Sequence, residues 1–169
     1  MALLSFNSKG IYCPPAKVYI DPWKPVKKAL ITHAHADHSR WGMEEYLAHH
    51  HSVPVMKHRL GSDIKVQGIG YGEKIQINGV EFSFHPAGHI PGSSQIKVSY
   101  KGETWVVSGD YKLEDDGLST PFEPVTCQNF ITESTFGLPV YSWPKQQDTF
   151  AEVNAWWRQN QEAGKVSII

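Results

Sequence analysis

The sequence has few cysteines, no excess of basic residues and no long apolar run. Its 169 residues include only Cys13 and Cys127, which form no CxxC pair, and two separated thiols without a secretory signal favour a reduced, cytoplasmic protein. Lysine and arginine total 16 against 17 aspartates and glutamates, so the charge does not indicate non-specific nucleic-acid binding. No stretch approaches the roughly 18 apolar residues that a membrane-spanning helix needs, so we do not expect a membrane protein.

Alternating apolar residues predict mainly β-structure over the first three quarters of the chain. The expected strands and hairpins lie at 16–20, 27–31, 54–56, 74–84, 94–110 and 129–135. The clearest is the hairpin 74–84, because Asn78-Gly79 is a strong two-residue turn. Helices are expected at 37–49 and 148–164. Hairpins mixed with helices predict an α/β or α+β layered sandwich.

The chain ends on "KVSII" (165–169), which reads as the opening of a buried strand. Nothing follows that could pair with this strand. We therefore expect the chain to be a fragment that contains one domain and the beginning of another.

The segment "ITHAHADH" (31–38) places three histidines and an aspartate within six positions. In an extended segment alternate side chains point the same way, so His33, His35 and Asp37 can converge while His38 faces a second position. Imidazole nitrogens and carboxylate oxygens suit zinc. Four ligands in six residues fit one ion poorly, which predicts two ions about 3.5 to 4 Å apart.

Further ligands follow two later strands. His89 stands in the Gly/Pro turn "HPAGHIPGSS" (85–94), and Asp110 ends the apolar strand of "VVSGDY" (106–111). The carboxylate of Asp110 can bridge two metals. We expect His85 and His58 to have no part in the site, and the neighbouring histidines 49–51 to be exposed in a polar loop.

With these motifs the chain resembles the metallo-β-lactamase superfamily, in which an HxHxDH motif, a later His after Gly and an Asp in a GD turn line the open edge of an αββα sandwich. The resemblance implies a site of two zinc ions, with manganese as the other candidate. It implies these ligands by motif: His33, His35 and His89 for one ion, and Asp37, His38 and the bridging Asp110 for the other. Asp21, in "VYIDP", matches the acidic residue that orients ligand histidines.

"SGDYK" followed by "ITESTFG" (131–137) resembles the β-CASP nucleases, in which the acidic residue matched by Glu133 marks the passage into an inserted second domain. Together "GIYCP", "YIDPWKPVKKALITHAHADHSRWG", "PAGHIPGSSQI" and "FGLPVYSWP" resemble bacterial ligase-associated DNA exonucleases over nearly the whole chain. This implies a metallo-β-lactamase domain over 1–145 and the start of a β-CASP domain over 146–169. It also implies single-stranded DNA or RNA as substrate, and a DNA ligase and a helicase as partners.

The expected function is therefore a metal-dependent phosphodiesterase, with Asp37, Glu133 and Asp21 as its catalytic residues beside the metal ligands. The resemblance places two further histidines, one a metal ligand and one a leaving-group acid, beyond Ile169, so we expect little activity from this chain alone. Two alternatives remain open. One is a thioester hydrolase of the glyoxalase kind, which "GHIPGSS" also fits. The other is a metal-binding fragment without activity.

Overall fold

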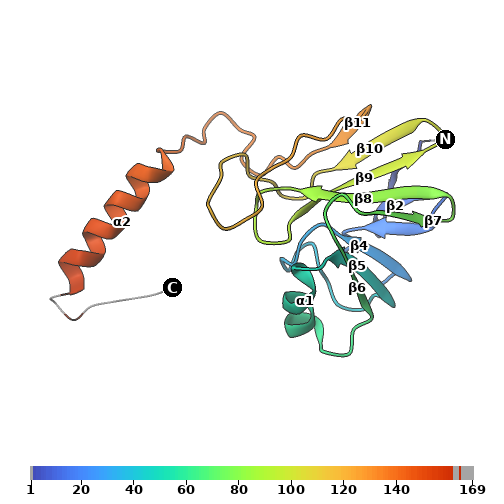
Figure 1. Ribbon diagram of the computed structural model, residues 1–169, viewed down its shortest axis with the longest axis horizontal. Coiled ribbons are helices and arrows are strands. Elements are labelled where there is room, and N and C mark those ends of the chain that lie inside the picture. The colour runs from blue at the N-terminus through green and yellow to red at the C-terminus, as the bar shows by residue number, and fades with distance from the viewer. Residues whose placement is uncertain (1, 162–163, 165–169) are drawn as a thin grey trace. The chain divides into compact units, whose positions relative to one another are not determined.

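The computed structural model describes residues 2–161 and 164 and forms eleven strands and two helices over them (Figure 1). In chain order these are β1 Ser5–Asn7, β2 Gly10–Cys13, β3 Val18–Ile20, β4 Lys28–Ile31, β5 Glu45–His49, α1 Ser52–Leu60, β6 Val66–Ile69, β7 Lys74–Ile77, β8 Val80–Pro86, β9 Ser94–Tyr100, β10 Glu103–Val107, β11 Asn129–Ile131 and α2 Gln146–Gln161. They fall into two units, Met1–Glu133 and Ser134–Ile169, the second of which contains α2.

The first unit is built on two sheets that lie face to face (Figure 1). One has the strand order β1-β2-β3-β4-β5-β6, and its strands from β3 to β6 run parallel. The other has the order β11-β10-β9-β8-β7 and is antiparallel except for the β10–β11 pair. The molecule is therefore a mixed α/β protein, as the hairpin and helix patterns predicted.

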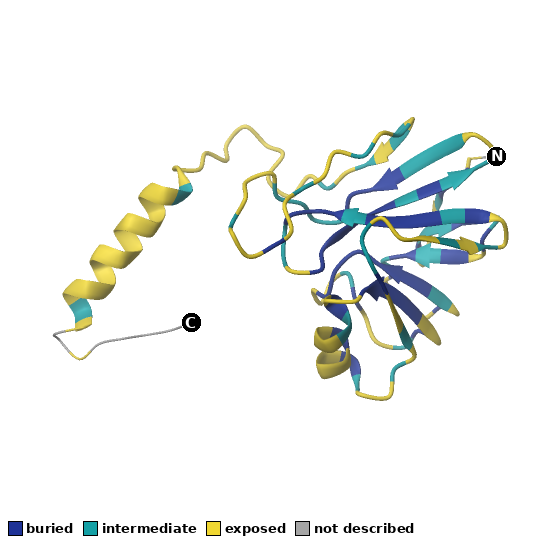
Figure 2. Cartoon of the chain, viewed as in Figure 1, coloured by how far each residue is buried: buried dark blue, intermediate teal, exposed yellow. Residues whose placement is uncertain are grey.

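The main core fills the space between the two sheets. Leu30 of β4 and Leu47 of β5 are paired across the first sheet, and Phe84 of β8 is paired with Ile96 of β9 across the second. All four side chains belong to one cluster of buried residues, drawn dark blue in Figure 2. Because side chains alternate along a strand, the neighbours of Leu30 face the opposite side of the first sheet.

That opposite side is covered by α1 (Figure 1). Ala29 and Ile31 of β4 pack there with Met56 and Leu60 of α1 in a second buried cluster. The spacing of Met56 and Leu60 puts both on one helix face. The helix, the first sheet and the second sheet thus form three layers, and the fourth, helical layer of the αββα sandwich stays a prediction.

This topology brings several strand ends to the same end of the sandwich. Asp21 follows β3 and Thr32 follows β4, and these strands are parallel. Asp110 follows β10 and Glu133 follows β11, which are also parallel. His89 follows β8, which has the direction of β10 because both are antiparallel to β9. Groups beyond the carboxyl ends of strands are well placed to form a binding site.

Two predicted elements are wrong. Residues 37–44 form bends and turns and lead into β5, where a helix over 37–49 was expected. The reason is that residues 45–49 pair with β4 and β6, so that Tyr46 and Leu47 face opposite sides of the sheet. A helix is also interrupted at Gly42, whose φ is 100°. The expected strand 54–56 lies inside α1, whose first turn accommodates Pro54.

The other expected elements are confirmed with shifted bounds: the first hairpin extends to Pro86, and α2, which was expected over 148–164, begins at Gln146. The strand expected at 165–169 lies outside the described residues. No residue of α2 is buried among those described, and the assignment of 146–169 to a second domain stays a prediction. Within the described residues, no helix combines the length and the apolar character needed to cross a membrane.

Candidate metal centre

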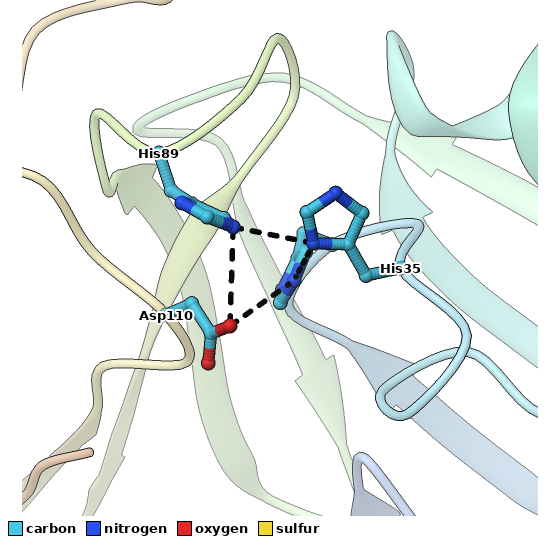
Figure 3. A group of neighbouring side chains, drawn as sticks. His35, His89 and Asp110 are labelled. Atoms are coloured by element: carbon cyan, nitrogen blue, oxygen red, sulfur yellow. Dashed lines mark hydrogen bonds and ion pairs between the residues drawn. The ribbon is translucent and has the colours of Figure 1, made fainter. Parts of the chain in front are cut away.

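Three histidines and an aspartate from both sheets meet at the end of the sandwich. The Nδ1 atom of His35 lies 3.1 Å from His33 Nε2 and 3.2 Å from His89 Nε2. The Oδ2 atom of Asp110 is 3.8 Å from each of those Nε2 atoms. Figure 3 shows His35 and His89 turning ring nitrogens toward each other, with the Asp110 carboxylate close by. The four donor atoms lie within 4.8 Å of one another and form the first donor group.

Asp110 also belongs to a second donor group, with Asp37 and His38. Its Oδ1 atom is 3.1 Å from His38 Nε2, which in turn is 3.5 Å from Asp37 Oδ2. Asp110 therefore offers Oδ2 to the first group and Oδ1 to the second. This is the position of a carboxylate that bridges two ions.

The spacing of the donors fits a tetrahedral metal. At metal–ligand distances of about 2.0 to 2.2 Å, neighbouring ligands of a tetrahedral ion lie about 3.3 to 3.6 Å apart. The donor pairs in direct contact lie 3.1 to 3.8 Å apart, and the remaining pairs within each group lie within 4.8 Å of each other, so the donors would close slightly around an ion. Imidazole nitrogens and carboxylate oxygens are also the donors that zinc accepts in a catalytic site. The residues present thus fit a pair of divalent ions, and the identity of the ion is left to experiment.

Asp21 contacts the ring nitrogen of His38 that does not face the second donor group. Its Oδ2 atom lies 2.8 Å from His38 Nδ1, while its Oδ1 accepts the backbone N–H of Thr32 at 2.8 Å. The hydroxyl of Thr32 is 2.5 Å from Asp21 Oδ2 and 3.1 Å from His33 Nδ1. Asp21 therefore contacts His38 directly and His33 through Thr32, and its orienting role stays a prediction. Thr32 was missed, although its place directly before the first histidine made it a candidate for such a contact.

The histidines differ in their charge. Burial, with smaller effects of His38, His35 and His89, lowers the pKa of His33 to about 2, so its ring is neutral, as a metal ligand must be. Burial also lowers the pKa of His38, but its hydrogen bond to Asp21 and the nearby carboxylates raise that pKa to about 9. The carboxylates that hold a proton on His38 would equally favour a bound metal cation, which would replace that proton when His38 acts as a ligand.

Two glycines allow the loops that carry His89 and Asp110. Gly88 has a φ of 75°, and a Cβ atom there would lie 2.2 Å from the carbonyl oxygen of Lys112. Gly109 has a φ of 56°, and a Cβ atom there would lie 2.6 Å from the Cβ of Thr32. Both residues need the left-handed conformation and close approach that glycine permits. This is the physical reason for glycine directly before each of these ligands.

Glu133 lies on the wall of a cavity beside the second group. The cavity has a volume of about 180 Å³, and Asp37, His38 and Asp110 also line it. The Oε1 atom of Glu133 accepts the backbone N–H of Tyr111 at 2.9 Å, which fixes the carboxylate on that wall. A larger cavity, of about 490 Å³, lies at the amino ends of β4 and β5, away from the histidines.

A third histidine group, His49, His50 and His51, follows β5. The expectation of an exposed loop is wrong for His49, which is 1% exposed and stacks on Tyr71 with ring centroids 3.7 Å apart. Its Nδ1 accepts the N–H of His51 at 3.3 Å. His49 is the last residue of β5, and its pairing with Ile69 of β6 and its stacking on Tyr71 bury the ring, which local polarity did not reveal. His85, expected outside the site, contacts Ser83 and Glu123 instead.

No family model matches the chain. It is 31% identical over 140 residues to a probable DNA ligase of Opitutus terrae, covering 81% of this chain and 14% of that protein. It is 31% identical over 144 residues to ribonuclease TTHA0252 of Thermus thermophilus, covering 69% of this chain and 33% of that protein. It is 37% identical over 83 residues to RNase aCSPSF2 of Saccharolobus solfataricus, covering 47% of this chain and 16% of that protein. These similarities fit the β-CASP group of the metallo-β-lactamase superfamily, which the motifs of the chain resemble.

The chain spans between 14% and 33% of the length of these relatives. All six of the metal ligands expected from the metallo-β-lactamase resemblance lie in one or both of the donor groups that share Asp110. Asp21 and Glu133 lie against them without belonging to either group.

Proposed function

We propose that this chain carries the two-metal centre of a β-CASP nuclease, a hydrolase that cleaves phosphodiester bonds. The observation that carries the proposal is that Asp110 directs one carboxylate oxygen to each of two donor groups. A shared carboxylate suits two ions about 3.5 to 4 Å apart, the spacing of two-metal phosphodiester hydrolysis. The similarity to proteins named as ribonucleases supports nucleic acid as the class of substrate.

In this proposal the ligands divide as follows: His33, His35 and His89 hold the first ion, Asp37 and His38 the second, and Asp110 both. Two Zn²⁺ or Mn²⁺ ions bound there would supply a nucleophile from water near neutral pH and offset negative charge on a phosphate. Asp21 engages the Nδ1 of His38, which leaves Nε2 to face the second group. Glu133, anchored on the cavity wall, would orient the acid that protonates the leaving oxygen.

Among nucleic acids we propose single-stranded DNA, degraded from an end, with RNA as the competing substrate. The support is the likeness to a probable DNA ligase over 81% of this chain and the motifs shared with ligase-associated exonucleases. The same likeness makes a DNA ligase and a helicase the partners to test, and the cytoplasm the compartment. It also supports an αββα sandwich over 1–145 and the start of a β-CASP domain over 146–169.

The metal centre can be tested with bis(p-nitrophenyl) phosphate. Its leaving group departs without being protonated and needs no groove for a strand, so the assay reports the metal centre alone. We expect hydrolysis that depends on added Zn²⁺ or Mn²⁺ and is lost in Asp110→Asn, which removes a ligand from both groups. Lys97→Met, a change on β9 that belongs to neither donor group, is the matched control.

Cleavage of end-labelled single-stranded DNA, of RNA and of a thioester by the same protein is then compared, and we expect cleavage of both nucleic acids to be weak because the resemblance assigns the leaving-group acid to a histidine outside this chain. Faster cleavage of DNA than of RNA, from one end, supports the exonuclease. Thioester cleavage that exceeds diester cleavage would instead favour a small-molecule hydrolase. Metal binding without hydrolysis of any of these substrates would favour an inactive metal-binding fragment.

A further inference from the structure

Arg59 reaches from α1 to the segment that supplies four of the proposed ligands. Its Nη1 atom donates to the carbonyl oxygen of Ala34 at 2.5 Å and to Ser39 Oγ at 2.8 Å. Ala34 stands between His33 and His35, and Ser39 directly follows His38. One nitrogen of Arg59 therefore holds both ends of the turn that carries the ligands.

Arg59 is an exposed residue, as Lys57 is, but the acceptors of Arg59 are buried and tied to the ligand backbone. Ala34 is 3% exposed and Ser39 is fully buried. The hydroxyl of Ser39 donates to the carbonyl oxygen of His35 at 3.0 Å, and its backbone N–H donates to the same oxygen at 2.8 Å. Arg59, Ser39 and His35 thus form a chain of hydrogen bonds that ends on a proposed ligand. Hydrogen bonds in which the donor is charged are stronger than neutral ones.

The helix that carries Arg59 is fixed on the outer side of the first sheet by Met56 and Leu60, both buried. The guanidinium contacts backbone and hydroxyl oxygens and belongs to neither donor group. It can therefore set the direction of the ligand side chains without touching an ion. Contacts that orient ligands in this way typically change metal affinity about 10- to 100-fold when removed.

We propose that Arg59 is a positioning residue for the metal centre. It fastens the 33–39 turn to α1, so that His35 and His38 reach their donor groups in the right orientation. This inference rests on the metal binding proposed above and adds a residue to it that none of the sequence motifs contains.

The test compares Arg59→Met with Lys57→Met, a matched loss of a positive charge from the exposed side of the same helix. Metal affinity is measured by competition with a chromophoric chelator, and ligand geometry by the visible absorption bands of the Co²⁺-loaded protein. We expect Arg59→Met to bind metal about 10- to 100-fold more weakly with shifted Co²⁺ bands, and Lys57→Met to match the wild type. Arg59→Lys, which can keep at most part of the two-acceptor contact, should lie between them.

The melting temperature of the metal-free proteins separates positioning from general stability. A lower melting temperature in Arg59→Met with unchanged metal affinity and unchanged Co²⁺ bands would overturn the inference. If Arg59→Met does not fold, Arg59→Lys decides, and wild-type affinity and bands in that variant would overturn it equally. A wild-type chain that binds no metal would instead contradict the proposed function.

Discussion

Gly109, directly before the proposed bridging ligand, allows a test of how tightly the metal centre is built. A Cβ atom at this position would lie 2.6 Å from Thr32 Cβ, 2.7 Å from its Oγ1 and 3.0 Å from its Cγ2. Such contacts require a displacement of Thr32 or of the backbone that carries Asp110. Gly102, in the hairpin turn between β9 and β10, also has a positive φ, but a Cβ atom there would have no neighbour within 4 Å. Gly102→Ala is therefore a matched control for Gly109→Ala.

Both alanine substitutions strain the backbone, but only Gly109→Ala also crowds its neighbours. An alanine in the left-handed region costs about 1 to 2 kcal/mol in either place. Crowding in a packed site typically adds about 1 to 3 kcal/mol. We therefore expect the free energy of unfolding to fall by about 1 to 2 kcal/mol in Gly102→Ala and by about 2 to 5 kcal/mol in Gly109→Ala.

Urea unfolding of the metal-free proteins measures this difference, and a chelator competition measures metal affinity. Gly109→Ala should also bind metal more weakly, because Thr32 is hydrogen-bonded to Asp21 and contacts His33. Gly102→Ala should bind it as the wild type does. If the two variants lose the same stability and keep the same metal affinity, the close packing of Gly109 on Thr32 does not hold the centre in place, and our reasoning about the GD turn is refuted.

Three further predictions concern the histidines and the two donor groups. His33→Ala should lose most bound zinc or manganese by elemental analysis whereas His50→Ala should lose none; equal losses would contradict the ligand assignment. A metal titration should fill two sites of unequal affinity, because the first group has four donors and the second three; two equally tight sites would contradict this. Burial lowers the pKa of His49 to about 4 from 6.5, so below about pH 6.5 the unfolded chain takes up a proton that the folded chain refuses. Stability should therefore fall by up to about 3 kcal/mol as the pH drops toward 4, and His49→Phe should remove that part of the pH dependence in urea unfolding.

That the six proposed ligands gather in one place could be predicted from local signals, because glycine before His89 and before Asp110 reflects steric needs within a few residues. The alternation expected within 33–37 is wrong: residues 34–39 form bends and a turn, and Asp37 groups with His38 instead of with His33 and His35. Of the strands that precede these ligands, β8 (VEFSFHP) carries an alternating pattern, whereas β4 (KALI) and β10 (ETWVV) end in apolar runs. Their parallel directions then bring the strand ends together. The roles assigned to the ligands stay proposals.

The failures arise where distant residues decide the structure. Residues 45–49 have good helix formers, yet they pair with β4 and β6 as the strand β5. His49 follows a polar-looking run but is buried under Tyr71. Arg59 is separated from Ala34 by 25 positions, and nothing near it in sequence indicates that its guanidinium reaches the ligand turn. Long-range pairing overrides local propensity in each case.

The metal centre lies where the two sheets are joined, and this explains how its donors can be held in place by the chain itself. The backbone N–H of Ser94, on β9 of the second sheet, donates to the carbonyl oxygen of Thr32, which follows β4 of the first, at 2.8 Å. The side chain of Thr32 packs against Gly109 and donates a hydrogen bond to Asp21. Thr32 therefore fixes the distance between the sheet that supplies His33 and the sheet that supplies Asp110. An ion bound between those two ligands would add a cross-link at the same place, so metal should stabilise the packing of the sheets against unfolding by mass action.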